Sequence, residues 1–250
     1  MPVKDLETIH GIHAVSAVLA RAPARVKWLG VLAGRRDERL RQVLELAVAA
    51  DVEVRELSRP DLDRAAGGEA HQGVIARVQA LGTVGEDYLF GEGLAALEES
   101  ALLLILDGVT DPHNLGACLR SAEAFGAQAL IAPRDNAAPL NATARKVASG
   151  AAELVPVVSV ANLARTIRRL QEAGIWIVGA AGEAGQRIWS VDLRGPVAIA
   201  MGAEGRGLRR LTREHCDFLV SIPMAGEVSS LNVSVAAGIC LYEARRQRTG

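Results

Sequence analysis

The sequence predicts an α/β protein in which a small α/β domain precedes a larger domain built on a parallel sheet covered by helices on both faces. Short apolar runs alternate with helical stretches after residue 100, which is typical of a parallel sheet buried on both sides. Residues 81–100 interrupt the chain with glycines and acidic side chains. A second, shorter series of strands and helices lies before that interruption.

The small domain is predicted at residues 1–80, which is long enough to fold alone with a modest core. Its elements are expected in the order strand 26–32, helix 37–50, strand 52–57, helix 61–66 and strand 73–78. Residues 81–100 contain four glycines and five acidic residues but no basic one, so we expect an acidic linker there.

Residues 101–250 predict the larger domain. Apolar runs that predict strands lie at residues 102–106, 129–132, 155–158, 175–179, 197–201 and 218–222. Helical stretches include residues 115–125 and 163–173, and a last helix is expected at residues 231–246. Ligands bind at the carboxyl ends of strands in open α/β sheets, so polar segments that follow these strands are the first candidates for a site.

Composition narrows the class of protein. The chain has 250 residues, 50% of them hydrophobic, and no run of 18 apolar residues, so we expect a cytoplasmic protein without a membrane span. Its three cysteines form no CxxC pair and its histidines have no ligand spacing, so neither a disulfide framework nor a metal site is expected. The net charge of −1 is low for a nucleic-acid binder, although the acidic segment at residues 81–100 offsets two mildly basic ends.

The first candidate segment is DGVTDPHNLG at residues 107–116, and it continues to Arg120. Asn114 is expected to cap the helix that follows. Gly116 and Arg120 lie four positions apart on one helix face, so a nucleotide could approach Gly116 and meet the guanidinium of Arg120. Alternatively, Gly116 only allows close helix packing and Arg120 pairs with an acid such as Glu123.

The other two candidate segments also follow predicted strands. Residues 201–207, MGAEGRG, lack the Lys-Ser or Lys-Thr of a P-loop. We expect Gly202, and Ala180 in another loop, to lie in tight turns that expose backbone groups to a ligand, while Glu204 is either a site residue or a surface charge. The third segment combines SIPM and SSLNVS, in which Ser229 or Ser230 would be an ordinary helix cap.

Together these three segments resemble the signature motifs of the SpoU branch of the SPOUT RNA methyltransferases, which transfer a methyl group from S-adenosylmethionine to a ribose 2'-hydroxyl. The resemblance covers nearly the whole chain and is nearest to the bacterial enzymes that modify a guanosine in 23S ribosomal RNA. GIHAV at residues 11–15 and HQG at residues 71–73 resemble the ribosomal-protein-like substrate-binding domain of such enzymes. The resemblance implies S-adenosylmethionine as the cofactor, 23S ribosomal RNA as the substrate, a homodimer and a C-terminal trefoil knot.

The resemblance also implies the roles of individual residues. The catalytic positions are Asn114, Arg120, Glu204, Ser230 and Asn232, and the cofactor-binding positions are Ala180, Gly202, Ile222 and Leu231. Arginine is a poor base because its pKa lies above about 12. We therefore favour a role for Arg120 in positioning the substrate and stabilising the developing oxyanion over a role as the base.

Two other functions remain open from the sequence. A transfer RNA guanosine-2'-O-methyltransferase would share all three motifs. A noncatalytic RNA-binding protein of ribosome assembly could be built on the same fold. The presence of Asn114, Arg120, Glu204 and Asn232 favours an enzyme.

Overall fold

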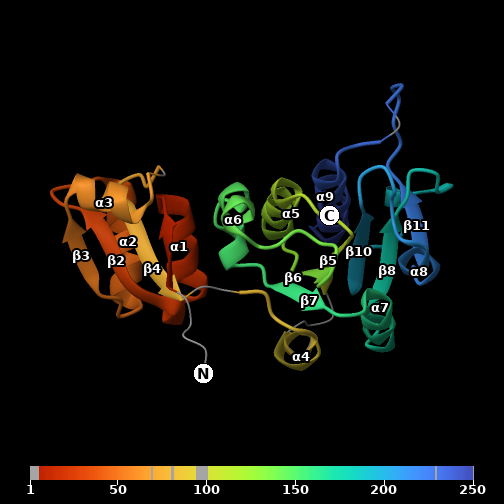
Figure 1. Ribbon diagram of the computed structural model, residues 1–250, viewed down its shortest axis with the longest axis horizontal. Coiled ribbons are helices and arrows are strands. Elements are labelled where there is room, and N and C mark those ends of the chain that lie inside the picture. The colour runs from red at the N-terminus through yellow and green to blue at the C-terminus, as the bar shows by residue number, and fades with distance from the viewer. Residues whose placement is uncertain (1–5, 69, 80–81, 94–100, 229, 250) are drawn as a thin grey trace. The chain divides into compact units, whose positions relative to one another are not determined.

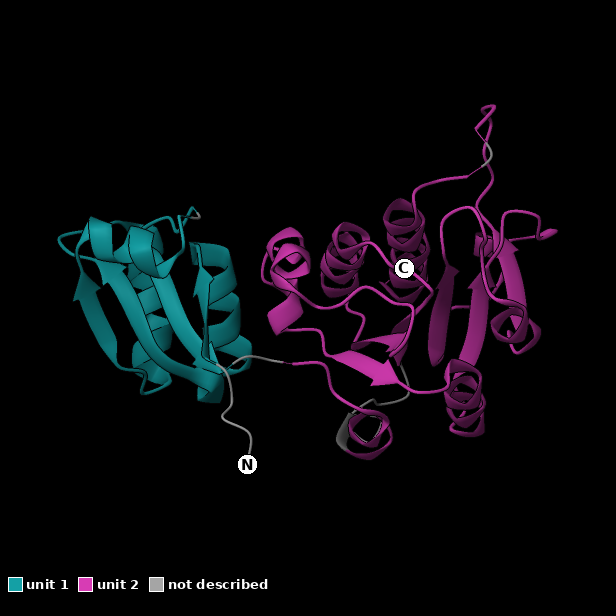
Figure 2. Ribbon diagram, in the orientation of Figure 1, with its two compact units in different colours: residues 1–81 teal, residues 82–250 magenta. Residues whose placement is uncertain are grey.

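The computed structural model describes residues 6–68, 70–79, 82–93, 101–228 and 230–249. The chain forms two compact units, residues 1–81 and residues 82–250, which are called unit 1 and unit 2 below (Figure 2). Each unit has its own sheet and its own hydrophobic core.

Unit 1 is built on a mixed four-stranded sheet in the order β1-β4-β2-β3. Its elements are β1 (Leu6–His10), α1 (Ile12–Arg21), β2 (Val26–Leu32), α2 (Glu38–Ala49), β3 (Val54–Leu57), α3 (Arg59–Ala65) and β4 (Val74–Gln79). Successive side chains of a strand point to opposite faces, and in β4 Val74 packs with α1 and α2 whereas Ile75 packs with α3. The sheet therefore has helices on both faces.

Unit 2 is built on a seven-stranded sheet in the order β7-β6-β5-β10-β8-β11-β9, with parallel pairing between the neighbouring strands. Its strands are β5 (Leu102–Asp107), β6 (Ala129–Pro133), β7 (Val157–Val160), β8 (Trp176–Ala180), β9 (Gln186–Arg187), β10 (Val197–Gly202) and β11 (Phe218–Ser221). Its helices include α5 (Pro112–Ala124), α6 (Ala142–Ala148), α7 (Leu163–Glu172), α8 (Arg210–Glu214) and α9 (Val233–Thr249). The predicted parallel sheet is confirmed.

The two faces of this sheet are covered by different helices. In β5, Leu104 packs on the side of α5 and α9, whereas Leu103 and Ile105 pack on the side of α7. Figure 1 shows α5 and α9 on one side of the sheet and α7 on the other. An apolar run such as residues 102–106 is buried on both sides for this reason.

The segment that was expected to be an acidic linker differs from that expectation. Its described part, residues 82–93, packs on unit 2: Val84 bridges to Val158 of β7, and Leu89 is buried. Glu86, in the short helix α4 (Glu86–Tyr88), forms ion pairs with Arg165 and Arg169 of α7 at 3.3 and 3.4 Å. The acidic residues that suggested a linker therefore include Glu86, which pairs with basic side chains of α7. Residues 81 and 94–100 of the expected linker lie outside the described residues.

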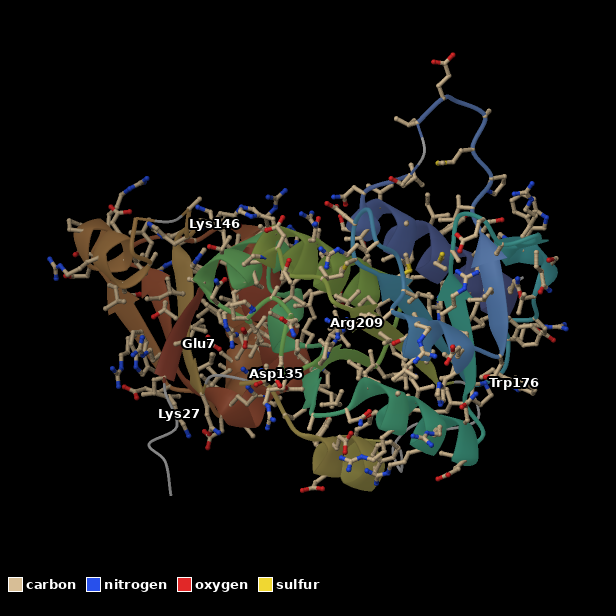
Figure 3. All side chains as sticks on the ribbon, turned by 45° about the vertical axis from the view of Figure 1, so that its right-hand side comes forward. Glu7, Lys27, Asp135, Lys146, Trp176 and Arg209 are labelled. Carbon is tan, nitrogen blue, oxygen red and sulfur yellow. The ribbon has the colours of Figure 1, made fainter. Side chains whose placement is uncertain are left out.

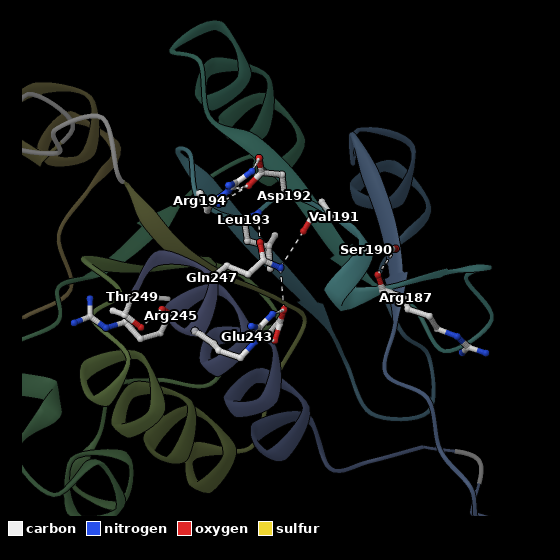
Figure 4. Close-up of polar contacts among 11 residues, drawn as sticks. Arg187, Ser190, Val191, Asp192, Leu193, Arg194, Glu243, Arg245, Gln247 and Thr249 are labelled. Carbon is white, nitrogen blue, oxygen red and sulfur yellow. Dashed lines mark hydrogen bonds and ion pairs between the residues drawn. The ribbon is translucent and has the colours of Figure 1, made fainter.

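The end of α9 is fixed by two side chains, Gln247 and Arg248, which we call the C-terminal clasp. Gln247 Oε1 accepts a hydrogen bond from the backbone amide of Leu193 at 2.9 Å, and Gln247 Nε2 donates to the carbonyl of Val191 at 3.1 Å (Figure 4). Arg248 donates to three carbonyls, those of Leu193, Gly195 and Ala101. Burial lowers the pKa of Arg248 below its usual range. The clasp ties the last helix to residues 191–195 and to the start of β5.

Candidate active site

The site lies where the strand order of unit 2 reverses. The chain leaves β5 toward β6 and β7, then crosses to β8 and returns to β10, which pairs with β5. Such a switch point leaves a crevice at the carboxyl ends of the strands. Asp107, the last residue of β5, is in register with Gly202, the last residue of β10. The loops that follow β5 and β10 therefore start side by side.

A pocket of about 530 Å³ lies beside this point, at the carboxyl ends of β8, β10 and β11. Six of the nine predicted site residues line it, namely Ala180, Gly202, Glu204, Ile222, Ser230 and Leu231. The start of α9 supplies Val233 and Ala236 to the same wall. The size is within the range of pockets that hold a nucleoside-sized ligand.

Three predicted catalytic residues form one hydrogen-bonded cluster, although they come from three separate segments: the first turn of α5, the loop after β10 and the residues just before α9. Asn114 Nδ2 donates to Glu204 Oε1 at 3.1 Å. Asn232 Nδ2 donates to the same oxygen at 2.7 Å and to Asn114 Oδ1 at 2.9 Å. We call Asn114, Glu204 and Asn232 the polar cluster. Glu204 is thus held by two amides and is not a free surface charge.

The two asparagines of the cluster occupy different positions from those expected. Asp111, not Asn114, caps α5, because its side chain accepts the amide of His113 and Pro112 occupies the first helical position. Asn114 therefore lies inside the first turn and is buried. Asn232, not Ser230, caps α9, since its Oδ1 accepts the amide of Ser234 at 2.9 Å. Ser229 lies outside the described residues.

Gly116 serves close packing, which was the alternative interpretation, and does not leave room for a nucleotide. A Cβ at Gly116 would lie 2.4 Å from the carbonyl oxygen of Ala144 and 2.7 Å from Cβ of Val147, both on α6. Arg120, one turn further on, is exposed, and its Nη1 lies 3.5 Å from Ser149 Oγ just after α6. The face of α5 that carries Gly116 and Arg120 thus packs along α6. Arg120 is not among the residues that line the pocket.

Gly116→Ala should destabilise the protein even though alanine is the better helix former. The helix preference favours alanine by about 1 kcal/mol, but overpacking against the backbone of α6 should cost about 2–3 kcal/mol and leave a net loss of about 1–2 kcal/mol. Chemical denaturation of both proteins measures this difference. Gly195→Ala is the control, since a Cβ there meets no atom within 4 Å. A G116A protein more stable than the parent would contradict the packing role.

Among the glycines that line the pocket, Gly202 leaves the least room for a side chain. A Cβ there would lie 1.9 Å from the carbonyl carbon of Gly207 and 2.1 Å from the amide nitrogen of Leu208. Residues 203–207 form a hairpin, closed by backbone hydrogen bonds in both directions between Ala203 and Gly207. We call it the Glu204 hairpin. Only glycine at position 202 lets this hairpin fold back onto the end of β10.

The pocket also has charged residues that the sequence analysis did not single out. Glu183 and Arg213 line it and form an ion pair. Hydrogen bonds from its own backbone amide and from Arg213 lower the pKa of Glu183. Glu183 lies in the loop that follows Ala180, the last residue of β8, so its place after a strand was the available signal.

Cys118 and Cys240 are buried in the apolar core, and Cys216 is half-buried. Burial raises the pKa of Cys118, Cys216 and Cys240 to about 12 in each case, so these thiols stay protonated near neutral pH. Among the residues that the structure describes, no three His, Cys, Asp or Glu side chains form a potential metal site. Within the same described ranges, none of the helices combines the length and apolar character that a bilayer crossing needs.

Fold and site together define an α/β protein with a nucleoside-sized pocket and a polar cluster at the switch point of a parallel sheet. Residues 101–242 match the family model of the SpoU rRNA methylases, and residues 8–84 match that of the RNA 2'-O ribose methyltransferase substrate-binding domain. The chain belongs to the SpoU rRNA methylase family.

Similar proteins match along almost the whole chain. The 23S rRNA (guanosine-2'-O-)-methyltransferases RlmB of Pseudomonas aeruginosa and Vibrio cholerae are 56% and 59% identical, and the alignments cover 97% of this chain and 97% of each relative. The crystal structure of the SpoU methyltransferase AviRb from Streptomyces viridochromogenes in complex with AdoMet has a TM-score of 0.74 at 26% identity, covering 97% of this chain and 90% of AviRb.

Proposed function

We propose that this protein methylates the ribose 2'-hydroxyl of a guanosine in 23S ribosomal RNA, with S-adenosylmethionine as the methyl donor. The observation that carries the proposal is the polar cluster beside the pocket, in a chain that matches RlmB proteins over nearly their full length. In this proposal unit 1 selects the RNA, and unit 2 carries out the transfer. The RNA substrate and those relatives favour a cytoplasmic protein.

The pocket fits the proposed cofactor. It has room for an adenosine, and its wall includes the bare backbone of Gly202, where a side chain would displace the Glu204 hairpin. The positions proposed to hold the cofactor are Ala180, Gly202, Ile222 and Leu231, all of which line the pocket. When bound, the cofactor supplies a methyl group already activated by a sulfonium. The proposal includes the C-terminal knot, with residues 202–208 and 222–231 as the chain segments around the cofactor.

The polar cluster would hold the target ribose, with Ser230 on the pocket wall beside it. Each amide of Asn114 and Asn232 is oriented by Glu204, so the cluster presents fixed hydrogen-bonding groups and does not have to order them during the reaction. Arg120 would bind the adjacent phosphate and stabilise the negative charge that develops on the ribose oxygen.

Arg120→Lys should keep most of the methyl-transfer rate, whereas Arg120→Ala should lose at least about 100-fold. A lysine keeps a positive charge for the phosphate and the developing oxyanion, and alanine keeps neither. Single-turnover rates with saturating cofactor measure both variants. A lysine variant as slow as the alanine variant would instead indicate a specific need for the guanidinium.

We also propose that the protein acts as a homodimer through α9. Val235, Ile239 and Tyr242 recur at helical spacing on this helix and are exposed to 50%, 37% and 55%. Tyr242 makes an edge-to-face contact with Phe125, the residue just after α5, at a centroid distance of 5.8 Å, which extends the apolar surface. Light scattering of the full chain, with Ile239→Asp as a comparison, tests this state: a dimer that the variant disrupts supports it, and a monomeric parent protein refutes it.

Methyl transfer from labelled S-adenosylmethionine to unmodified 23S ribosomal RNA, with unmodified transfer RNA in parallel, tests the proposed activity. Nucleoside mass spectrometry should find 2'-O-methylguanosine in the ribosomal RNA alone. Label in transfer RNA alone would move the protein to the transfer RNA enzymes. Label in neither RNA, together with no binding of S-adenosylmethionine, would favour the noncatalytic function.

A further inference from the structure

Asp107 is a buried carboxylate that has no role in the reaction proposed above. It ends β5 at the switch point, and its side chain is 0% exposed. Its Oδ2 accepts one hydrogen bond, from the backbone amide of Arg209 at 2.8 Å. Its Oδ1 is buried without a hydrogen bond among the described residues. A buried charge that is only partly satisfied lowers stability, so its presence needs an explanation.

The nearest charge to the unsatisfied oxygen is also on Arg209. Nε of Arg209 lies 3.5 Å from Asp107 Oδ1, close enough for an ion pair. The guanidinium lies against Gly108, which has φ +82° and whose Cβ, if present, would be 3.3 Å from Nη2 (Arg209 is labelled in Figure 3). Asp107 and Gly108 together form a seat for Arg209.

This seat fixes both ends of the loop that carries Glu204. Gly202, at one end, pairs with Asp107 in the sheet, and Arg209, at the other end, is bound by the Asp107 side chain. The Glu204 hairpin lies between these two points. Its Glu204 orients the amides of Asn114 and Asn232, so a shift of the hairpin would move all three members of the polar cluster.

We infer that Asp107 is a positioning residue for methyl transfer: through Arg209 it holds the Glu204 hairpin so that the polar cluster keeps its geometry. Asp107 does not line the pocket and does not touch the cluster. The inference rests on the proposed function, since it assigns Asp107 a task in that reaction. Small displacements of positioned groups can lower a rate by about 100-fold, so a loop clamp of this kind can affect catalysis strongly.

Asp107→Asn is the variant that tests the inference. Its amide oxygen can still accept the Arg209 amide, but the charge that holds the guanidinium is gone. We expect kcat for methyl transfer to fall at least about tenfold, with a smaller loss of affinity for S-adenosylmethionine in calorimetry. Hydrogen exchange of residues 203–209 should become faster in the cofactor-free protein. Arg209→Gln should lower kcat similarly, and the double variant should lose little more than either single variant.

Asp217→Asn is the control. Asp217, which is exposed, also accepts a backbone amide, that of Ile177 at 2.7 Å, but it precedes β11 and so lies at the amino ends of the strands, away from the site. The kcat of the Asp217→Asn variant should equal that of the parent protein. Equal kcat losses in D107N and D217N, or unchanged exchange of residues 203–209 in D107N, would overturn the inference. If the parent protein transfers no methyl group to 23S ribosomal RNA, the proposed function fails, whereas the exchange experiment still decides whether Asp107 holds the hairpin.

Discussion

Gly202→Ala should abolish measurable binding of S-adenosylmethionine. The added Cβ would lie within about 2 Å of backbone atoms of Gly207 and Leu208, and no side-chain rotation can relieve a clash with backbone. The Glu204 hairpin must therefore open, and the pocket wall opens with it. We expect the Kd to rise at least about 100-fold, which corresponds to roughly 2.8 kcal/mol. Isothermal titration calorimetry with the full chain measures the change.

Gly185→Ala is the control for this substitution. Gly185 lies in the loop between β8 and β9, and a Cβ there meets no atom within 4 Å. Its affinity for S-adenosylmethionine should equal that of the parent protein. Native affinity in G202A as well would mean that the hairpin does not shape the cofactor pocket.

Glu204→Ala should cost at least about 100-fold in kcat/KM while the protein stays folded. The substitution removes the common acceptor of two amides, and Asn114, which is buried, loses the acceptor of its Nδ2 group. A buried polar group left without a partner costs about 1–3 kcal/mol, so the two asparagines should rearrange. Methyl-transfer kinetics and thermal unfolding, measured together, separate this loss of geometry from a loss of fold.

Two further variants define what Glu204 contributes. Glu204→Gln keeps an oxygen that can accept from the asparagines, so it should be faster than the alanine variant. Equal rates for glutamine and alanine would show that the negative charge is essential. Glu214→Ala removes an exposed glutamate paired with Arg210 on α8 and should leave the kinetics native.

The sequence predicts the strands of unit 2 well because their apolar runs are buried on both faces. Residues 197–201 and 218–222, for example, nearly coincide with β10 and β11. It does not predict β1 or α6. In β1 only Ile9 is buried, so the apolar pattern is weak, and α6 is a short alanine-rich helix whose position depends on contact with Gly116.

The site could be predicted in part for a related reason. Strand ends that share one edge bring their loops together, so Asn114, Glu204 and Asn232 could be expected to meet. Which residue caps α5 could not be deduced in the same way, because Asp111 and Asn114 are both good caps and Pro112 decides between them. The contact between Asp107 and the backbone of Arg209 spans 102 positions and has no local signal at all.

The order in which the chain is synthesised determines when the C-terminal clasp and the cofactor pocket can form. Unit 1 lies wholly within the first third of the chain, so it can fold while the ribosome is still adding unit 2. The pocket wall formed by Leu231 and Ala236, and the clasp residues Gln247 and Arg248, are synthesised after the other strands and loops of the pocket. The cofactor pocket therefore cannot be complete before these residues have been added, and a chain released before residue 231 lacks this wall.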